Sequence, residues 1–240
     1  PYWDFGMLPG TLERWHSEGM PTDGIIGDLF ELDDRRKIDV DFTMVPKFEI
    51  ETLSEDAEYQ VFRDQFGIMQ RRQKANLPGM PEFLQYPIAN RGDFQKMKER
   101  YDPSSSERYP PDWSSYVAQN GDDRTFTLYL QEFRHVGFFG PLRNWMGLET
   151  LLMAMVEQPA WVEEMTEFVA DTIIGIRQRI PAKITLDYVT FFEDIGYKTS
   201  TLISPAMFRR FMTGPYRRVT DCFRSCGTQC FFGDSDGYND

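Results

Sequence analysis

The spacing of apolar residues changes near the middle of the chain. From residue 125 onward, short apolar runs alternate with longer stretches in which apolar residues recur at helical spacing. This alternation predicts an α/β protein in which helices connect parallel strands. Strands are expected at 125–130, 184–191 and 229–233, and helices at 142–158, from Pro159 to about residue 180, and after Ser204.

The first half of the chain has a less regular pattern. Residues 40–48 alternate between apolar and polar positions and predict a strand, whereas residues 90–101 have helical spacing. Residues 59–74 alternate around Gly67, which predicts a β-hairpin or meander outside the main core. Because no fixed-period repeat and no low-complexity linker is present, we expect one domain over residues 1–240.

One stretch combines a strand, an acidic loop and a helix start. The apolar run 184–191 is typical of a strand buried on both faces, and Glu193 and Asp194 follow directly after it. Ser204 and Pro205 then form a strong helix-start signal. Acidic side chains after a parallel strand occupy the position where α/β enzymes keep their chemistry. The alternative is that the two acidic residues only solvate a loop.

A second acidic pair follows the last predicted strand. Asp234 and Asp236 are two positions apart, so in an extended backbone both carboxylates lie on one face. They could bind a divalent metal, or act as acid and base if proximity to Glu193 raises one pKa. An aspartate-rich turn closed by Gly237 explains the same residues without a site.

One of the two histidines follows a predicted strand. His135 comes after the run 125–130, where a metal ligand or an acid–base group would be well placed. A structural histidine that is hydrogen-bonded at the strand end accounts for it equally well. The sequence leaves both interpretations open.

The composition of the chain limits which partners it can bind and indicates its cellular compartment. The net charge of −12 argues against nucleic acid or an anionic membrane surface as the main partner. No apolar run approaches the ~20 residues of a membrane span, and no signal peptide is visible. The three cysteines, at 222, 226 and 230, do not form a disulfide framework and fit no zinc site by spacing alone. A cytoplasmic protein is therefore expected.

Several stretches together resemble a known family. They are TLERWHSEGMP (11–21), GMPEFLQYPIANRGDFQKMKERYDP (79–103), GFFGPLRNWMGLETLLMAM (137–155), FFEDIGYKTSTLISPAMFRRFMTGPYRRV (191–219) and DSDGY (234–238). The chain is similar to the uroporphyrinogen decarboxylase superfamily, and within it to the divergent, corrinoid methyltransferase-like branch. The resemblance implies a (β/α)8 barrel of the TIM type. It also implies that the chain is truncated at its C-terminal end, with about six of the eight strands present.

Two departures from the family pattern bear on substrate and metal. Uroporphyrinogen decarboxylases follow an N-terminal Pro-x-Trp with an arginine-containing segment that binds carboxylates, but here Trp3 is followed by Asp4. This disfavours an octacarboxylate porphyrinogen. Related methyltransferases carry a His-x-Cys-Gly zinc pair where Asp234 and Asp236 stand, so an oxygen-ligated ion or a protonated carboxylate is expected instead.

The resemblance implies an enzyme that moves a methyl group between a small substrate and a corrinoid protein. The corrinoid would be carried by that partner, and a divalent metal would be the cofactor held by this chain; a homodimer is expected by analogy. One alternative is a decarboxylase of tetrapyrrole biosynthesis, in which an arginine would bind a carboxylate of the substrate. Another is a non-catalytic fragment. The residues expected to act are Glu193, Asp194 and His135 in catalysis, Asp234 and Asp236 on the metal, and Trp3, Asp4, Arg134, Arg143 and Tyr197 on the substrate.

Overall fold

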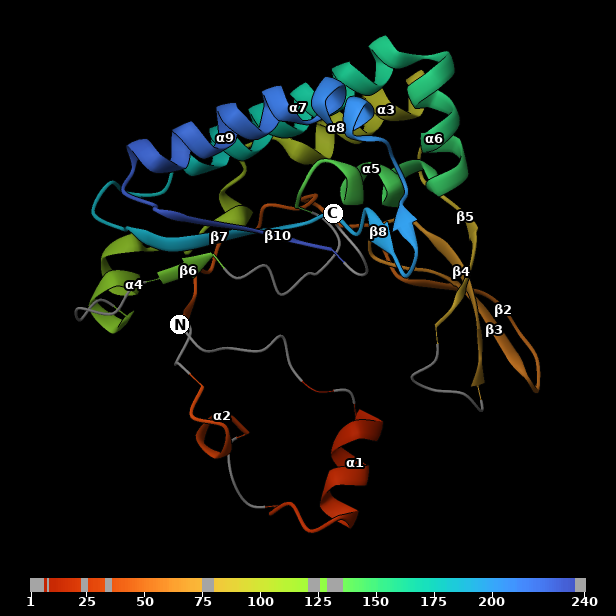
Figure 1. Cartoon of the computed structure of the whole chain (residues 1–240), viewed down its shortest axis with the longest axis horizontal. Coiled ribbons are helices and arrows are strands. Elements are labelled where there is room, and N and C mark those ends of the chain that lie inside the picture. The colour runs from red at the N-terminus through yellow and green to blue at the C-terminus, as the bar shows by residue number, and fades with distance from the viewer. Residues whose placement is uncertain are drawn as a thin grey trace. The chain divides into compact units, whose positions relative to one another are not determined.

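The computed structural model describes residues 7, 9–22, 26–32, 36–74, 80–120, 126–128 and 136–235. The chain divides into two compact units, residues 1–36 and residues 37–240. The first unit contains α1 (Pro9–Ser17) and α2 (Ile26–Leu29), drawn in red and orange in Figure 1. In this unit the rings of Trp15 and Phe30 are 5.9 Å apart.

A parallel sheet forms the centre of the second unit. The strand order is β1 (Arg36–Lys37), β6 (Phe126–Leu128), β7 (Leu186–Phe192) and β10 (Cys230–Asp234). β7 pairs in parallel with both β6 and β10. The predicted alternation of strand and helix after residue 125 is therefore present, and the C-terminal ends of β7 and β10 lie side by side.

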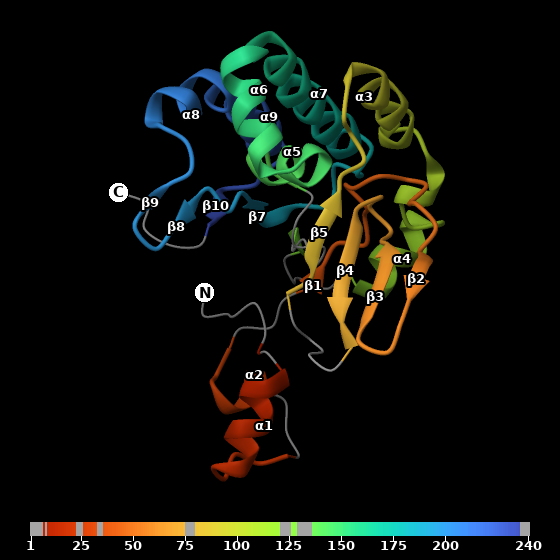
Figure 2. The ribbon, with the colours of Figure 1, turned by 90° about the vertical axis from the view of Figure 1, so that its right-hand side faces the viewer.

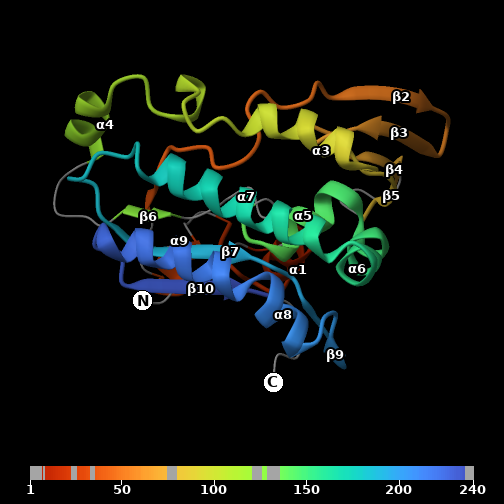
Figure 3. The same ribbon diagram turned by 90° about the horizontal axis from the view of Figure 1, so that it is seen from above.

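Helices connect these parallel strands. The first crossover contains α5 (Phe139–Met146), α6 (Leu148–Glu157) and α7 (Pro159–Arg177); the second contains a short hairpin (β8, Gly196–Tyr197; β9, Ser200–Thr201) followed by α8 (Pro205–Phe211) and α9 (Thr213–Ser225). Figures 1 and 3 show α7 and α9 lying along one face of β7 and β10. The apolar side chains between them form one buried core, which includes Val162, Val189, Phe191 and Val219.

The capping residues explain where two of these helices begin. The Ser204 side chain accepts a hydrogen bond from the Met207 N–H at 3.2 Å, and Pro205 occupies the first turn of α8, as the sequence predicts. The predicted single helix over 142–158 is wrong, because it is interrupted at Gly147. This residue has φ +82°, and a Cβ there would lie 2.6 Å from the Tyr86 ring, so only glycine is tolerated without a rearrangement.

A second sheet is antiparallel and pairs only within itself. Its strands are β2 (Glu51–Glu55), β3 (Tyr59–Arg63), β4 (Met69–Gln73) and β5 (Glu82–Gln85), in sequence order (Figure 2). β3 and β4 form a β-hairpin, one of the two arrangements predicted for residues 59–74. After it come α3 (Arg91–Lys98), with the predicted start at Asn90, and α4 (Trp113–Asn120).

The strand predicted for residues 40–48 is not formed. Its apolar side chains are buried, but its backbone bonds to a loop instead of a neighbouring strand. Arg108 is 1% exposed and donates to the carbonyl oxygens of Asp41 and Thr43, while the Asp41 N–H donates to the Arg108 carbonyl. Alternating apolar residues therefore mark a packed segment here, in which residues 42–45 are all buried and a buried guanidinium takes the place of a partner strand.

The expected (β/α)8 barrel, with about six of its eight strands, is wrong. The described part of the chain has one small sheet with three parallel strands and a separate four-stranded antiparallel sheet. Barrel strands are parallel and require a crossover helix between neighbours, whereas β2 to β5 follow one another as antiparallel neighbours. The observed architecture is α/β, with two four-stranded sheets and the small β8–β9 hairpin in the described part of the chain.

Candidate functional site

Glu193 lies directly after β7 and is 3% exposed. Its Oε1 accepts a hydrogen bond from the Phe138 N–H at 2.7 Å, and its Oε2 accepts from the N–H groups of Phe139 at 2.5 Å and Gly140 at 3.2 Å. The Tyr216 hydroxyl, from α9, donates to Oε1 as well. The carboxylate therefore caps the N-terminus of α5, a position that favours negative charge.

The Gly-Phe-Phe-Gly sequence at 137–140 explains how this contact forms. A Cβ at either Gly137 or Gly140 would lie 2.5 Å from the Phe192 carbonyl oxygen, and Gly137 has φ +151°. Only glycine lets the start of α5 come this close to the end of β7. The motif thus brings backbone donors to a carboxylate more than fifty positions later in the chain.

Burial and hydrogen bonding act on Glu193 in opposite directions. Burial raises the pKa of the carboxyl, while the Tyr216 hydroxyl and the three backbone N–H groups lower it, and the balance lies above the ordinary value. The pKa of Tyr216 is raised well above its ordinary value by burial and by the charge of Glu193. The tyrosine hydroxyl therefore stays protonated and donates to the carboxylate.

Asp194 has a different environment from its neighbour. Its backbone is in the left-handed region, with φ +53°, and its carboxylate pairs with Arg143 Nη2 at 3.2 Å. Arg143 Nη1 also donates to the Asp194 carbonyl oxygen at 3.3 Å. Arg143, expected to bind substrate, is thus held by the loop that carries the acidic pair.

The backbone joins the two acidic strand ends. The N–H groups of Glu193 and Asp194 both donate to the Asp234 carbonyl oxygen, at 2.9 and 3.2 Å. The Gly196 N–H donates to Ser235 Oγ at 3.0 Å. The expected convergence of the ends of β7 and β10 is therefore present at the level of the main chain.

The remaining predicted site residues are only partly within the described structure. Tyr197, on β8, is 49% exposed. The residues Trp3, Asp4, Arg134, His135 and Asp236 lie outside the described residues. Among the described residues, no three His, Cys, Asp or Glu side chains gather as a metal-ligand group, so the metal predicted at Asp234 and Asp236 remains a prediction.

A pocket of about 570 Å³ opens beside the Glu193–Tyr216 pair. We call it the strand-end pocket; its residues come from the ends of β7 and β10, from the loops that follow them and from α8 and α9. Its volume lies within the range of small-molecule sites, and its wall is mainly apolar, with five aromatic residues and two arginines. The lining residues are Phe191, Glu193, Ile195, Phe208, Thr213, Tyr216, Arg217, Thr220, Arg224, Phe231, Phe232, Gly233 and Ser235.

Sequence reasoning missed Tyr216, the residue that links the acid to the pocket. Its ring packs edge-on against Phe138, with centroids 4.6 Å apart, and against Phe191, at 5.1 Å. In the sequence, Tyr216 is one more aromatic residue on an amphipathic helix. No local signal showed that it would meet Glu193, which lies 23 positions earlier.

Comparison with known proteins does not assign the chain to a group. No protein-family model, no curated protein and no solved structure gives a significant match. None of the helices in the described part of the chain combines the length and the apolar character needed to cross a membrane.

Proposed function

We propose that the protein is an enzyme that binds a small substrate with an aromatic or apolar body in the strand-end pocket and transfers a methyl group from it. One observation carries the proposal: a buried carboxyl group, hydrogen-bonded to a partly buried phenol, borders an apolar pocket at the C-terminal ends of parallel strands. Pockets with perturbed carboxyl groups at this end of a parallel sheet are preferred positions for enzyme chemistry.

The resemblance described above favours a corrinoid protein as the acceptor. In such a step the C–O bond of a methyl ether breaks, the methyl group passes to the reduced corrinoid of the partner, and the leaving oxygen needs a proton. When Glu193 is protonated, its O–H can donate to the Tyr216 oxygen, which frees the Tyr216 O–H to donate into the pocket. The raised pKa of Glu193 favours this protonated form.

In the proposed mechanism, contacts around the loop after β7 keep Glu193 and Tyr216 in place. Asp194 and Arg143 fix the loop after β7 through their ion pair, and the Asp234 carbonyl ties that loop to β10. Arg143, one of the two arginines expected as a carboxylate anchor for a decarboxylase, is paired with Asp194. A cytoplasmic location belongs to the same proposal.

Substitution of the phenol tests the proposal. Tyr216→Phe keeps the ring in the aromatic cluster and removes the hydroxyl, so we expect methyl transfer to cob(I)alamin to fall about 100-fold, as for loss of a general acid. The methyl donors to screen are aromatic methyl ethers. Methyl transfer is measured as the change in corrinoid absorbance. Tyr101→Phe is the matched control, because Tyr101 is a buried tyrosine hydrogen-bonded to Trp145 and is not among the residues that line the pocket.

Two results would contradict the proposal. In the first, aromatic ethers bind in the strand-end pocket but no donor methylates the corrinoid. The protein would then be a binding protein or a different enzyme. If Tyr216→Phe and Tyr101→Phe lower the rate equally, the Tyr216 hydroxyl has only a structural role.

A further inference from the structure

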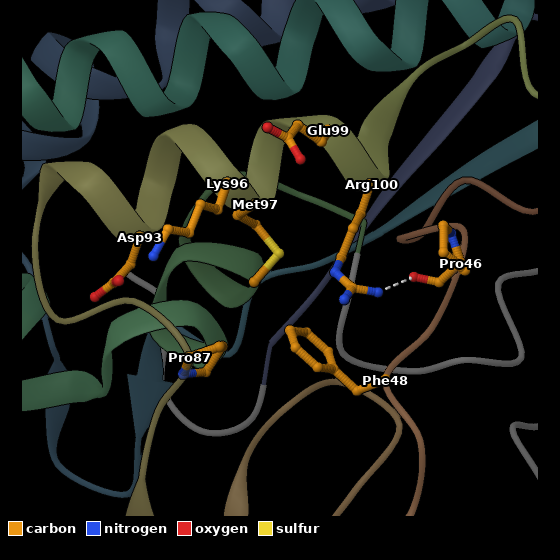
Figure 4. Close-up of a pocket in the computed structure, with 8 residues that line it drawn as sticks. All are labelled: Pro46, Phe48, Pro87, Asp93, Lys96, Met97, Glu99 and Arg100. Atoms are coloured by element: carbon orange, nitrogen blue, oxygen red, sulfur yellow. Dashed lines mark hydrogen bonds between the residues drawn. The ribbon is translucent and has the colours of Figure 1, made fainter.

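A second pocket, of about 540 Å³, lies away from the strand ends. Figure 4 shows it between α3 and the segment that contains Pro46 and Phe48. We call it the helix–loop pocket. None of its lining residues also lines the strand-end pocket, so a ligand here is independent of the proposed function.

One wall of the helix–loop pocket is apolar and fixed in place. Phe48 is anchored by its N–H, which donates to the Gln65 carbonyl at 2.9 Å, and its ring packs so closely on Gly67 that a Cβ there would lie 2.8 Å away. Met97 is 3% exposed and extends toward the same space (Figure 4). This wall suits a planar or aliphatic body.

Arg100 brings a rigid cation to this wall. Its guanidinium carbon is 4.0 Å from the centroid of the Phe48 ring, and its Nη1 donates to the Pro46 carbonyl oxygen at 2.7 Å. The main chain is fixed too, since the Arg100 carbonyl accepts from Val45 N–H and from Arg108 Nη2, both at 2.7 Å. Within the described residues no carboxylate pairs with Arg100, although a guanidinium in this position can bind a carboxylate through two N–H groups.

Lys96 adds a second cation one helical turn before Arg100. It is exposed, and the described part of the chain provides no ion-pair partner for it. The carboxylates of Asp93 and Glu99 also line the pocket, but they neutralise only part of the Lys96 charge. Asp93 Oδ2 accepts from Ala89 N–H at 3.1 Å and from Asn90 Nδ2 at 2.9 Å, and the Glu99 side chain points away from Met97 and Arg100 in Figure 4.

We propose that the helix–loop pocket is a binding site for a small organic monocarboxylate, with its apolar body on Phe48 and Met97 and its carboxylate on Arg100. Lys96 adds a second positive charge from the Asp93 end of the lining (Figure 4). A single negative charge matches this pair of cations better than a polyanion does, because Asp93 and Glu99 remain nearby and would repel further charge. The charge-assisted hydrogen bonds to Arg100 would supply orientation, and the apolar wall would supply most of the affinity.

Methionine-methyl NMR of the intact chain tests this inference. The probe is phenylacetate, and its neutral isostere phenylacetamide is the comparison. We expect phenylacetate to shift the Met97 methyl signal in a saturable manner and phenylacetamide to bind about tenfold more weakly, in line with the loss of a charge-assisted hydrogen bond.

A substitution at an exposed position separates recognition of the carboxylate charge from non-specific binding of the probe. Lys96→Gln removes an exposed nearby charge and should weaken phenylacetate about threefold while it leaves phenylacetamide unchanged. Lys183→Gln, an exposed lysine elsewhere in the second unit, should change neither. The inference is overturned if phenylacetate leaves the Met97 signal unmoved, or if acid and amide bind equally well to the wild type. It is also overturned if Lys96→Gln and Lys183→Gln behave alike. None of these results depends on methyl transfer, so they leave the proposed function untouched.

Discussion

In the parallel sheet, Glu193 bonds to N–H groups 53 to 55 positions earlier in the chain. In the antiparallel sheet, the side-chain contacts between neighbouring strands are local: Arg63 reaches Glu51, and Arg72 reaches Gln60, each 12 positions away. The first sheet therefore depends on one buried carboxylate that joins three segments, whereas the second depends on many exposed pairs. A single substitution should damage the first far more than the second.

The largest expected effect comes from removing the buried cap. Glu193→Ala leaves three helix N–H groups and the Tyr216 hydroxyl without their partner, so we expect a loss of about 4 kcal/mol in the free energy of unfolding. Asp93→Ala removes a carboxylate from the less buried start of α3 and should cost about 1 kcal/mol. Urea unfolding of both variants measures the difference. Equal losses would show that Glu193 does not couple the segments.

Substitution of two glycines, one near each sheet, tests the same difference between the two sheets. Gly140→Ala places a methyl group against the Phe192 carbonyl oxygen, which cannot move without distorting β7, and should destabilise by about 3 kcal/mol. Gly67→Ala, beside the antiparallel sheet, meets the Phe48 ring, which can rotate, but it must also adopt φ +81°. We expect about 2 kcal/mol for that variant. Thermal and urea unfolding check both values, and a milder effect at Gly140 would contradict the close approach of α5 to β7.

The pH dependence of stability should report on Glu193. Because its pKa is raised on folding, the folded state binds the proton more tightly, so this contribution is fully present below the ordinary value of 4.5 and is lost as pH rises through the folded-state pKa. Glu193→Gln should remove that part of the slope. The measurement is the difference in unfolding free energy between wild type and variant, taken from about pH 4 to about pH 8. A difference that does not change with pH would argue against the raised pKa.

The smallest effect is expected from exposed ion pairs, whether they join the helices that cover the parallel sheet or neighbouring strands of the antiparallel sheet. Arg218, on α9, pairs with Glu167 and Asp171 of α7, but all three side chains are more than 40% exposed. Arg218→Ala and Arg63→Ala should each cost about 0.5 kcal/mol, less at high salt. A double-mutant cycle with Glu167→Ala checks the first pair. A coupling above about 2 kcal/mol would show that the α7–α9 contact depends on charge more than on its apolar core.

The sequence by itself determined the elements with strong local signals. Ser204 and Pro205 start α8 because a side-chain acceptor and a fixed φ act within one turn, and Asn90 starts α3 for the same reason. The alternation after residue 125 predicted parallel strands, and the main chain of Glu193 and Asp194 does meet that of Asp234 at the ends of β7 and β10. These features depend on neighbours a few positions apart.

Only the tertiary structure decided how these elements combine. The number of strands in each sheet, and hence the absence of the expected barrel, depends on pairing between distant segments, which local periodicity does not encode. Residues 40–48 form no strand, and the buried Arg108 guanidinium satisfies the backbone carbonyls of Asp41 and Thr43 instead. Glu193 and Asp194 are adjacent in sequence, yet one is buried against α5 and Tyr216 while the other pairs with Arg143. Their chemistry differs because a carboxylate takes its pKa and its partners from the groups packed around it, and the fold brings those groups from elsewhere in the chain.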